Sequence, residues 1–189
     1  ARGLFHRAIA QSAPVAAVHS AAQAAFWCNE LVTRAGLTNP TLDELRKLSP
    51  ETLIGAGQSM LWRSGELLNL NACFGAIVDG DLIRDHPITT FRAGEQHKIP
   101  LMIGTNIDEV AFAKTFYFRS KKRAQRARTM LEGYDPHGAD TILRFYNNAA
   151  SRNDYAELLT DSVFWAPSVI AASAHSLSAP TWMYRFDYA

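Results

Sequence analysis

The sequence has only two cysteines, Cys28 and Cys73, and they are far apart in the chain. A disulfide framework or a zinc site needs cysteines, or cysteines and histidines, at close and characteristic spacings. No C-x-x-C pair or zinc-like pattern occurs here. We therefore expect two separate buried thiols, and neither a metal site nor a cofactor.

An excess of charge of one sign is also missing. The net charge is +1, from 19 Lys and Arg and 18 Asp and Glu, so bulk charge favours neither a nucleic-acid nor a membrane partner. No apolar run approaches the roughly 20 residues of a spanning helix, so no membrane span is expected. Because the chain begins at Ala1, both a cytoplasmic and a secreted location stay open.

One local cluster of positive charge is present within residues 119–128. A solvated helix is the preferred interpretation, because the cluster lacks interleaved aromatic residues and acidic residues elsewhere balance it. A basic helix that binds nucleic acid is the weaker alternative. The cluster consists of Arg119, Lys121, Lys122, Arg123, Arg126 and Arg128.

Apolar segments alternate with segments of helical periodicity, which predicts an α/β fold with parallel strands joined by crossovers. Strands are expected at residues 4–12, 99–105 and 181–188, and an extended segment at 74–81. Helices are expected at 20–35, after the capping-box residue Thr41, from Ser49-Pro50, from Asp135-Pro136, and between 155 and 177.

Three strands make a poor complete parallel sheet, because such sheets are usually wider and are buried on both faces. The first predicted strand begins near residue 1 and the last ends at residue 188. The pattern therefore predicts the rear part of an open sheet. An open edge at the first strand favours an oligomer, a partner chain or a covering segment there.

The segment 101–113, LMIGTNIDEVAFA, has two adjacent acids, Asp108 and Glu109, directly after a predicted buried strand. Ligands in open α/β sheets bind at the carboxyl ends of the strands, so this is a suitable place for a functional acid. From the residues alone, the favoured interpretation is still a solvated start of a loop or helix.

Four segments together carry a resemblance over essentially the whole chain. GLFHRAIAQS, FGAIVDGDLIRDHP, HKIPLMIGTNIDE and WMYRFDY occur in this order. They resemble the type B carboxylesterases, the esterase and cholinesterase branch of the α/β-hydrolase fold. The resemblance implies that residues 1–189 form the C-terminal portion of a single α/β-hydrolase catalytic domain. It also implies a small-molecule ester substrate.

The resemblance assigns two residues. The second carboxylate of the family's N-x-D-E segment is the acid of a Ser-Glu-His triad, and Glu109 matches it. The serine of the family's Q-S-G turn orients that acid, and Ser12 matches it, so the resemblance implies that Ser12 holds Glu109 by a hydrogen bond. Ala13 and Val110 stand where the family usually has glycine. Because a valine at positive φ is costly, we expect the loop around Glu109 to be shifted.

The other members of a triad are missing from the sequence. No G-x-S-x-G nucleophile elbow and no Gly-Gly segment for an oxyanion hole occur. His137 and His175 follow the acid, but both precede the last strand and are expected at the surface or at helix ends. The prediction is a serine carboxylesterase as the intact protein, inactive as this chain alone. The alternative is a non-catalytic, cholinesterase-like adhesion or interaction domain.

Overall fold

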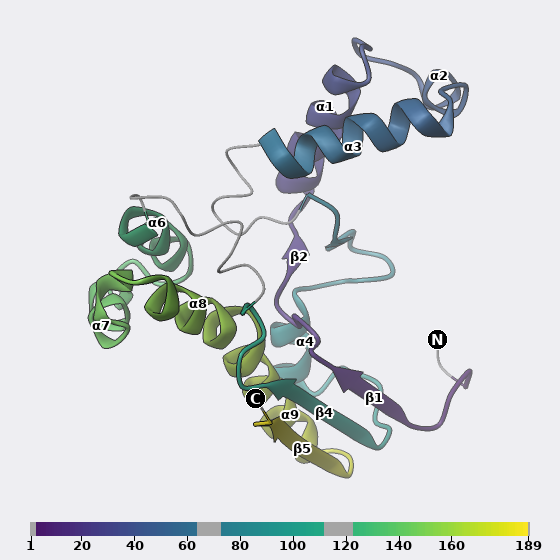
Figure 1. The fold of residues 1–189 in the computed structure, drawn as a ribbon. Helices are drawn as coiled ribbons and strands as arrows, with labels where there is room; N and C mark the ends of the chain where they lie inside the picture. The colour runs from purple at the N-terminus through teal and green to yellow at the C-terminus, as the bar shows by residue number, and fades with distance from the viewer. Residues whose placement is uncertain (1–2, 64–72, 112–122, 189) are drawn as a thin grey trace. The chain divides into compact units, whose positions relative to one another are not determined.

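The computed structural model describes residues 3–63, 73–111 and 123–188 (Figure 1). The chain divides into two compact units, which are treated separately below. The first unit comprises Ala1–Ala16 and Asp85–Ala189, and the second comprises Ala17–Arg84. That both units belong to one catalytic domain stays a prediction.

The first unit contains a parallel sheet of three strands in the order β1-β4-β5 (Figure 1). Its strands are β1 (Ala8–Gln11), β4 (Leu101–Asn106) and β5 (Thr181–Phe186). The helices are α4 (Pro87–Ala93), α6 (Arg123–Tyr134), α7 (Ala139–Phe145), α8 (Arg152–Thr160) and α9 (Ala166–Ser176). A 3-10 turn (Asn147–Ala149) precedes α8, and a π-helical turn (Asp161–Trp165) joins α8 to α9.

One face of this sheet is packed. Leu101 and Ile103 of β4 are buried against Ala171 and Ala172 of α9, and Phe91 of α4 packs against the same cluster. Alternate residues of a strand point to opposite faces, so these two β4 side chains share the face that the helices cover. Burial of each large aliphatic side chain contributes about 1.5–3 kcal/mol. β4 pairs with β1 on one side and β5 on the other, so this packed strand is the central one of the three.

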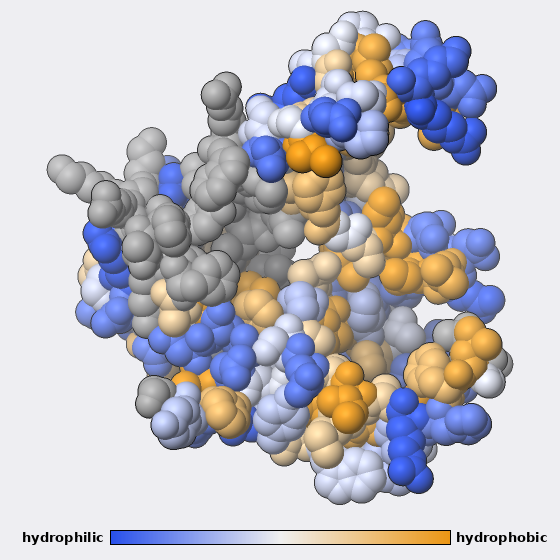
Figure 2. Space-filling model, turned by 45° about the vertical axis from the view of Figure 1, so that its right-hand side comes forward, coloured by the Kyte–Doolittle hydropathy of each residue, from blue (hydrophilic) through white to orange (hydrophobic). Residues whose placement is uncertain are grey.

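The opposite face of the sheet is apolar but exposed. Ile9, Met102 and Trp182 lie side by side across the three strands. Their side chains are 67%, 41% and 56% exposed, respectively. In Figure 2, hydrophobic residues likewise reach the surface in several places. Parallel sheets are usually buried on both faces, so this exposed face differs from that of a complete sheet.

The second unit is built on two long helices. Its elements are β2 (Val18–His19), α1 (Ala21–Arg34), α2 (Leu42–Arg46), α3 (Pro50–Arg63) and β3 (Ala76–Ile77), with β2 and β3 paired in parallel. Trp27 of α1 and Met60 of α3 form a buried cluster with Cys73. Arg34 donates to the Ser59 Oγ at 2.8 Å, which adds a polar link between the two helices.

The two cysteines are free thiols, as predicted, but only one is buried. Cys73 lies in the α1–α3 cluster, and burial raises the pKa of its thiol. Cys28 is exposed on α1, so the prediction of burial is wrong for it.

Part of the basic cluster starts helix α6. Arg123, Arg126 and Arg128 lie in this helix, whereas Arg119, Lys121 and Lys122 fall outside the described residues. Arg128 forms ion pairs with Glu132 and Asp140. The helix is therefore as expected from residue 123 onward. In the described part of the chain, no helix is both long enough and apolar enough to cross a membrane.

Candidate active site

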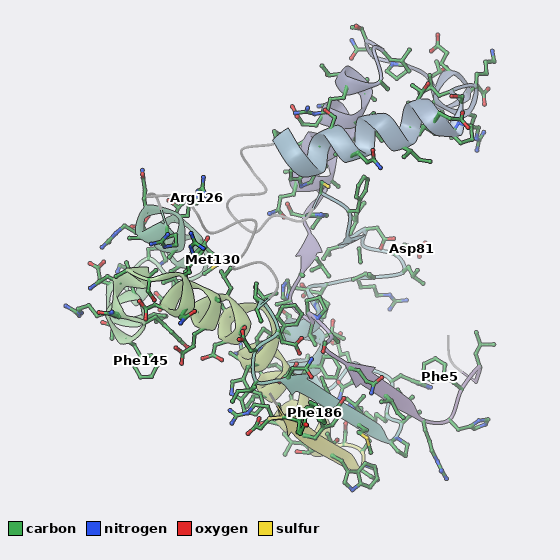
Figure 3. All side chains as sticks on the ribbon, viewed as in Figure 1. Phe5, Asp81, Arg126, Met130, Phe145 and Phe186 are labelled. Carbon is green, nitrogen blue, oxygen red and sulfur yellow. The ribbon has the colours of Figure 1, made fainter. Side chains whose placement is uncertain are left out.

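Strand β4 carries the predicted acid to the carboxyl end of the sheet. The ladder between β4 and β5 continues past the strand, because the Ile107 N–H donates to the Phe186 carbonyl at 3.0 Å. Phe186, labelled in Figure 3, is the last residue of β5. The turn that bears Asp108 and Glu109 follows at once. The first residue of this turn, Ile107, is thus hydrogen-bonded to β5.

Gly104 is needed in β4 because the Tyr184 ring lies close to its backbone. The ring of Tyr184 on β5 occupies the space that a side chain at position 104 would fill. An alanine there would collide with the ring, so the strand's path next to β5 depends on glycine. Position 104 also pairs with Gln11 of β1, where the first strand ends.

The carboxylate of Glu109 is held by one residue of β4. The backbone N–H of Asn106 donates to Oε1 at 2.7 Å, and its side-chain Nδ2 donates to Oε2 at 3.1 Å. Each carboxylate oxygen therefore has one donor among the described residues. Glu109 is half-buried, whereas the neighbouring Asp108 is exposed. The two adjacent acids thus have different environments.

Ser12 lies at the same end of the sheet, directly after β1. Its backbone N–H donates to the Gly104 carbonyl at 2.8 Å, which extends the pairing of β1 with β4. Its Oγ accepts a hydrogen bond from Asn106 Nδ2 at 3.2 Å. The same amide nitrogen thus contacts both Ser12 and Glu109. The resemblance implied a hydrogen bond between Ser12 and Glu109; in the structure the two side chains are joined through the Asn106 amide instead.

The two positions where the family usually has glycine do not adopt a backbone conformation that requires glycine. Among the described non-glycine residues, Ser12 has positive φ, at 53°, but Ala13 and Val110 do not. The steric cost expected for Val110 in a left-handed conformation therefore does not arise. The turn accommodates valine, and Asn106 still reaches the Glu109 carboxylate.

Neither candidate histidine lies beside Glu109. His175 is 2% exposed, in the last turn of α9, and its Nε2 lies 2.8 Å from the Ile99 carbonyl. Ile99 precedes β4, so His175 is at the amino end of a strand that is about 17 Å long. Its helix-end position is as expected, but its burial is not. His137 is exposed, in the turn before α7.

The tautomer of His175 follows from its partners. A carbonyl oxygen only accepts, so Nε2 carries the proton and donates to Ile99. Nδ1 then accepts from Gln96 Nε2 at 3.0 Å. Both ring nitrogens are therefore used in joining α9 to the segment before β4. Within the described ranges, no group of three or more His, Cys, Asp or Glu side chains is arranged to hold a metal ion.

Asn106 is the residue that sequence reasoning missed. Its position in the N-x-D-E segment was visible, but its three hydrogen bonds were not. The only signal is an amide side chain three residues before the acid, where a backbone turn can bring the two together. The contact with Ser12 joins residues that are 94 positions apart, so it could not be read from local sequence.

Comparisons with known proteins agree with the resemblance. The model of a family described as "Carboxylesterase family" matches residues 1–189. The chain is 31% identical over 191 residues to para-nitrobenzyl esterase of Bacillus subtilis (strain 168), covering 100% of this chain and 38% of that protein. It is 26% identical to the liver carboxylesterase of Sus scrofa, covering 100% of this chain and 38% of that protein.

Solved structures give the same answer for the fold. A PNB esterase structure matches with a TM-score of 0.81 and 27% identity, covering 100% of this chain and 39% of that one. A structure titled "THERMOPHYLIC PNB ESTERASE" matches with a TM-score of 0.79 and 28% identity, covering 99% and 38%. The parallel sheet with flanking helices is thus part of an α/β-hydrolase fold, as predicted. The chain spans less than two thirds of these relatives.

Proposed function

This chain belongs to the carboxylesterase family, and from that premise we propose that the intact protein hydrolyses small-molecule carboxylic esters through an acyl-serine intermediate. The observation that carries the proposal is the Glu109 carboxylate, held by two hydrogen bonds at the carboxyl end of β4. In this proposal Glu109 is the acid of a Ser-Glu-His triad.

The acid's task is to fix and stabilise a histidine. A serine hydroxyl is a weak nucleophile until an imidazole takes its proton, and a carboxylate keeps that imidazole in the right tautomer and stabilises the imidazolium that forms. A carboxylate has about four lone-pair positions. Asn106 uses one on each Glu109 oxygen, which leaves acceptor capacity on both for a histidine N–H.

The remaining catalytic groups would come from residues beyond these 189. The chain has no nucleophile elbow, and the relatives it matches are much longer. The nucleophilic serine, the histidine and the oxyanion amides are therefore assigned to those residues. Ser12 steadies the acid through the amide of Asn106.

The test is a pair of substitutions in the protein that carries its nucleophile segment. Glu109→Gln keeps the shape of the side chain and removes the charge, so kcat should fall about 10³- to 10⁴-fold while the protein stays folded. Asp108→Asn, one residue away, removes the same charge from an exposed acid and should change kcat less than about threefold. Equal kcat for wild type and Glu109→Gln would remove Glu109 from the mechanism.

Chain 1–189 alone should not hydrolyse esters, since it would lack both the nucleophile and the base. A rate that is abolished by a serine-directed reagent, measured on the pure chain, would contradict the proposal. The alternative of a non-catalytic adhesion domain makes a different prediction, because the intact protein would then fail to react with such reagents at all.

A further inference from the structure

Asn106 makes three hydrogen bonds at the end of β4, and all of its N–H groups take part. The backbone N–H donates to Glu109 Oε1 at 2.7 Å. The side-chain Nδ2 donates to Glu109 Oε2 at 3.1 Å and to Ser12 Oγ at 3.2 Å. An amide nitrogen has two protons, so each of its two acceptors receives one.

The acceptors also determine which way the amide faces. An ionised carboxylate only accepts hydrogen bonds, so the amide nitrogen, and not the amide oxygen, must face Glu109. Reversing the amide would place its oxygen next to Oε2 of Glu109, two acceptors facing each other, and remove the hydrogen bond between Asn106 Nδ2 and Oε2. The orientation is therefore fixed by chemistry as well as by geometry.

The backbone of Asn106 is a rigid reference for these contacts. The residue closes β4, where it pairs with Phe186 of β5, and the next residue still donates to the Phe186 carbonyl. The preceding residue, Thr105, is 1% exposed. A glutamate has several rotatable bonds and loses up to about 2 kcal/mol of conformational entropy when it is fixed. Donors on a strand end can hold it in one arrangement.

We propose that Asn106 is a positioning residue for the catalytic acid, through which Ser12 also acts. This inference rests on the proposed role of Glu109. Asn106 orients both carboxylate oxygens toward the place where the histidine must lie, and Ser12 in turn holds the Asn106 amide. The order of action is Ser12 to Asn106 to Glu109.

A purely structural role makes a different prediction. If Asn106 only stabilised the turn, its loss would lower the free energy of unfolding, and kcat of the folded protein would be nearly unchanged. A positioning role lowers kcat and leaves KM nearly unchanged, because a misplaced acid weakens the chemical step and not substrate binding.

The experiment measures kcat and KM of single and double variants of the protein that carries its nucleophile segment. Asn106→Ala removes the side-chain donors and should lower kcat about 10- to 100-fold, by analogy with the range for residues that orient the ligands of a metal site. Asn106→Leu, which keeps a similar branched shape, should behave alike and replaces the alanine variant if that one is unstable. Asn153→Ala, on an exposed position of α8, is the control and should leave kcat and KM unchanged.

Two double variants test the order of action. Because Asn106 acts through Glu109, Asn106→Ala should lower kcat no further in a Glu109→Gln background. Because Ser12 acts through Asn106, Ser12→Ala should lower kcat less than Asn106→Ala does, and no further in the Asn106→Ala background. Losses that multiply in either double variant would overturn the proposed order.

The outcomes separate this inference from the proposed function. If Glu109→Gln keeps the wild-type kcat, the triad assignment fails, and the positioning role fails with it. If Glu109→Gln loses activity but Asn106→Ala and Asn106→Leu keep the wild-type kcat, only the positioning role fails. A rise in KM with unchanged kcat would likewise refute positioning.

Discussion

Replacing His175 by phenylalanine should destabilise the protein by removing a buried polar link. The imidazole donates to the Ile99 carbonyl at 2.8 Å and accepts from Gln96 Nε2 at 3.0 Å. It also packs edge-on against Phe91, with ring centroids 5.8 Å apart. A phenyl ring is of similar size, so the packing is largely kept while both hydrogen bonds are lost.

The magnitude follows from the groups that lose a partner. Each hydrogen bond contributes about 1 kcal/mol net, and a buried polar group left without its partner costs about 1–3 kcal/mol. Gln96 Nε2 also donates to Ser178 Oγ at 3.1 Å and therefore keeps a partner when the imidazole is removed. Most of the cost of an unpaired polar group thus comes from the Ile99 carbonyl, which loses its His175 donor. We expect the free energy of unfolding to fall by roughly 2–4 kcal/mol.

The assay is equilibrium urea unfolding followed by circular dichroism, with the slope m compared between variants. His137→Ala is the matched control, because His137 is exposed and its backbone N–H, which donates to Asp135, is unchanged. This control should lie within about 0.5 kcal/mol of wild type. A His175→Phe protein as stable as wild type would refute the assignment of these two hydrogen bonds as a structural link.

Three further predictions concern the sheet and the helices around it. Gly104→Ala should lower the free energy of unfolding by about 1–3 kcal/mol in the same assay, because the added methyl group meets the Tyr184 ring; an unchanged value would contradict this close approach. Burial raises the pKa of Tyr155 in the folded state. Its contribution to the free energy of unfolding is therefore fully present below about pH 10, the pKa of an exposed tyrosine, and is lost as the pH rises through the folded-state pKa. Tyr155→Phe should therefore lose less stability than wild type above about pH 10. Parallel curves of unfolding free energy against pH for the two proteins would contradict the raised pKa. Because Ile9 is exposed on an edge strand, chain 1–189 should associate in sedimentation velocity as its concentration rises, and a monodisperse monomer would contradict a need for a neighbour at β1.

The order and type of the main elements could be predicted because periodicity and capping are local signals. Thr41 caps α2 through a capping box with Glu44, as the T-L-D-E pattern indicated. Helix α3 begins at Pro50, as expected for proline at the first helical position. All three strands of the main sheet were found, and they pair in parallel.

The boundaries were less accurate, and at two of them a side-chain hydrogen bond takes up a backbone group. The second strand begins at Leu101 and not at Ile99, whose carbonyl accepts from His175 instead. Helix α7 begins at Ala139 and not at Asp135, because the Asp135 side chain accepts from the His137 N–H in a preceding turn. Local hydrogen bonds such as that of Asp135 compete with regular structure.

Two further details of the structure were not visible in the sequence patterns. Helical structure was expected between 155 and 177, and α8 and α9 cover this segment with a π-helical turn between them at Asp161–Trp165. Tyr146 donates to Asp161 at 2.6 Å, and the Arg185 guanidinium lies 5.3 Å from the Trp165 ring centroid. The extended segment 74–81 is a strand only at Ala76–Ile77. Asp79 then accepts from the amides of Asp81 and Ile83, which favours a turn.

The two residues of the candidate site could be proposed from the sequence, but the contact that joins them could not. Glu109 and Ser12 could be named from short motifs, since each follows a predicted strand. The amide that joins them could not, because it depends on the register of β1 against β4.

The most direct test of the central assignment is the reactivity of the catalytic serine itself. A phosphonylating reagent that labels activated serines reports the nucleophile without the later hydrolysis step. In the protein that carries its nucleophile segment, Glu109→Gln should slow labelling about 10³-fold or more, while Asp108→Asn labels like wild type. Labelling at the wild-type rate in Glu109→Gln would contradict the role of this carboxylate.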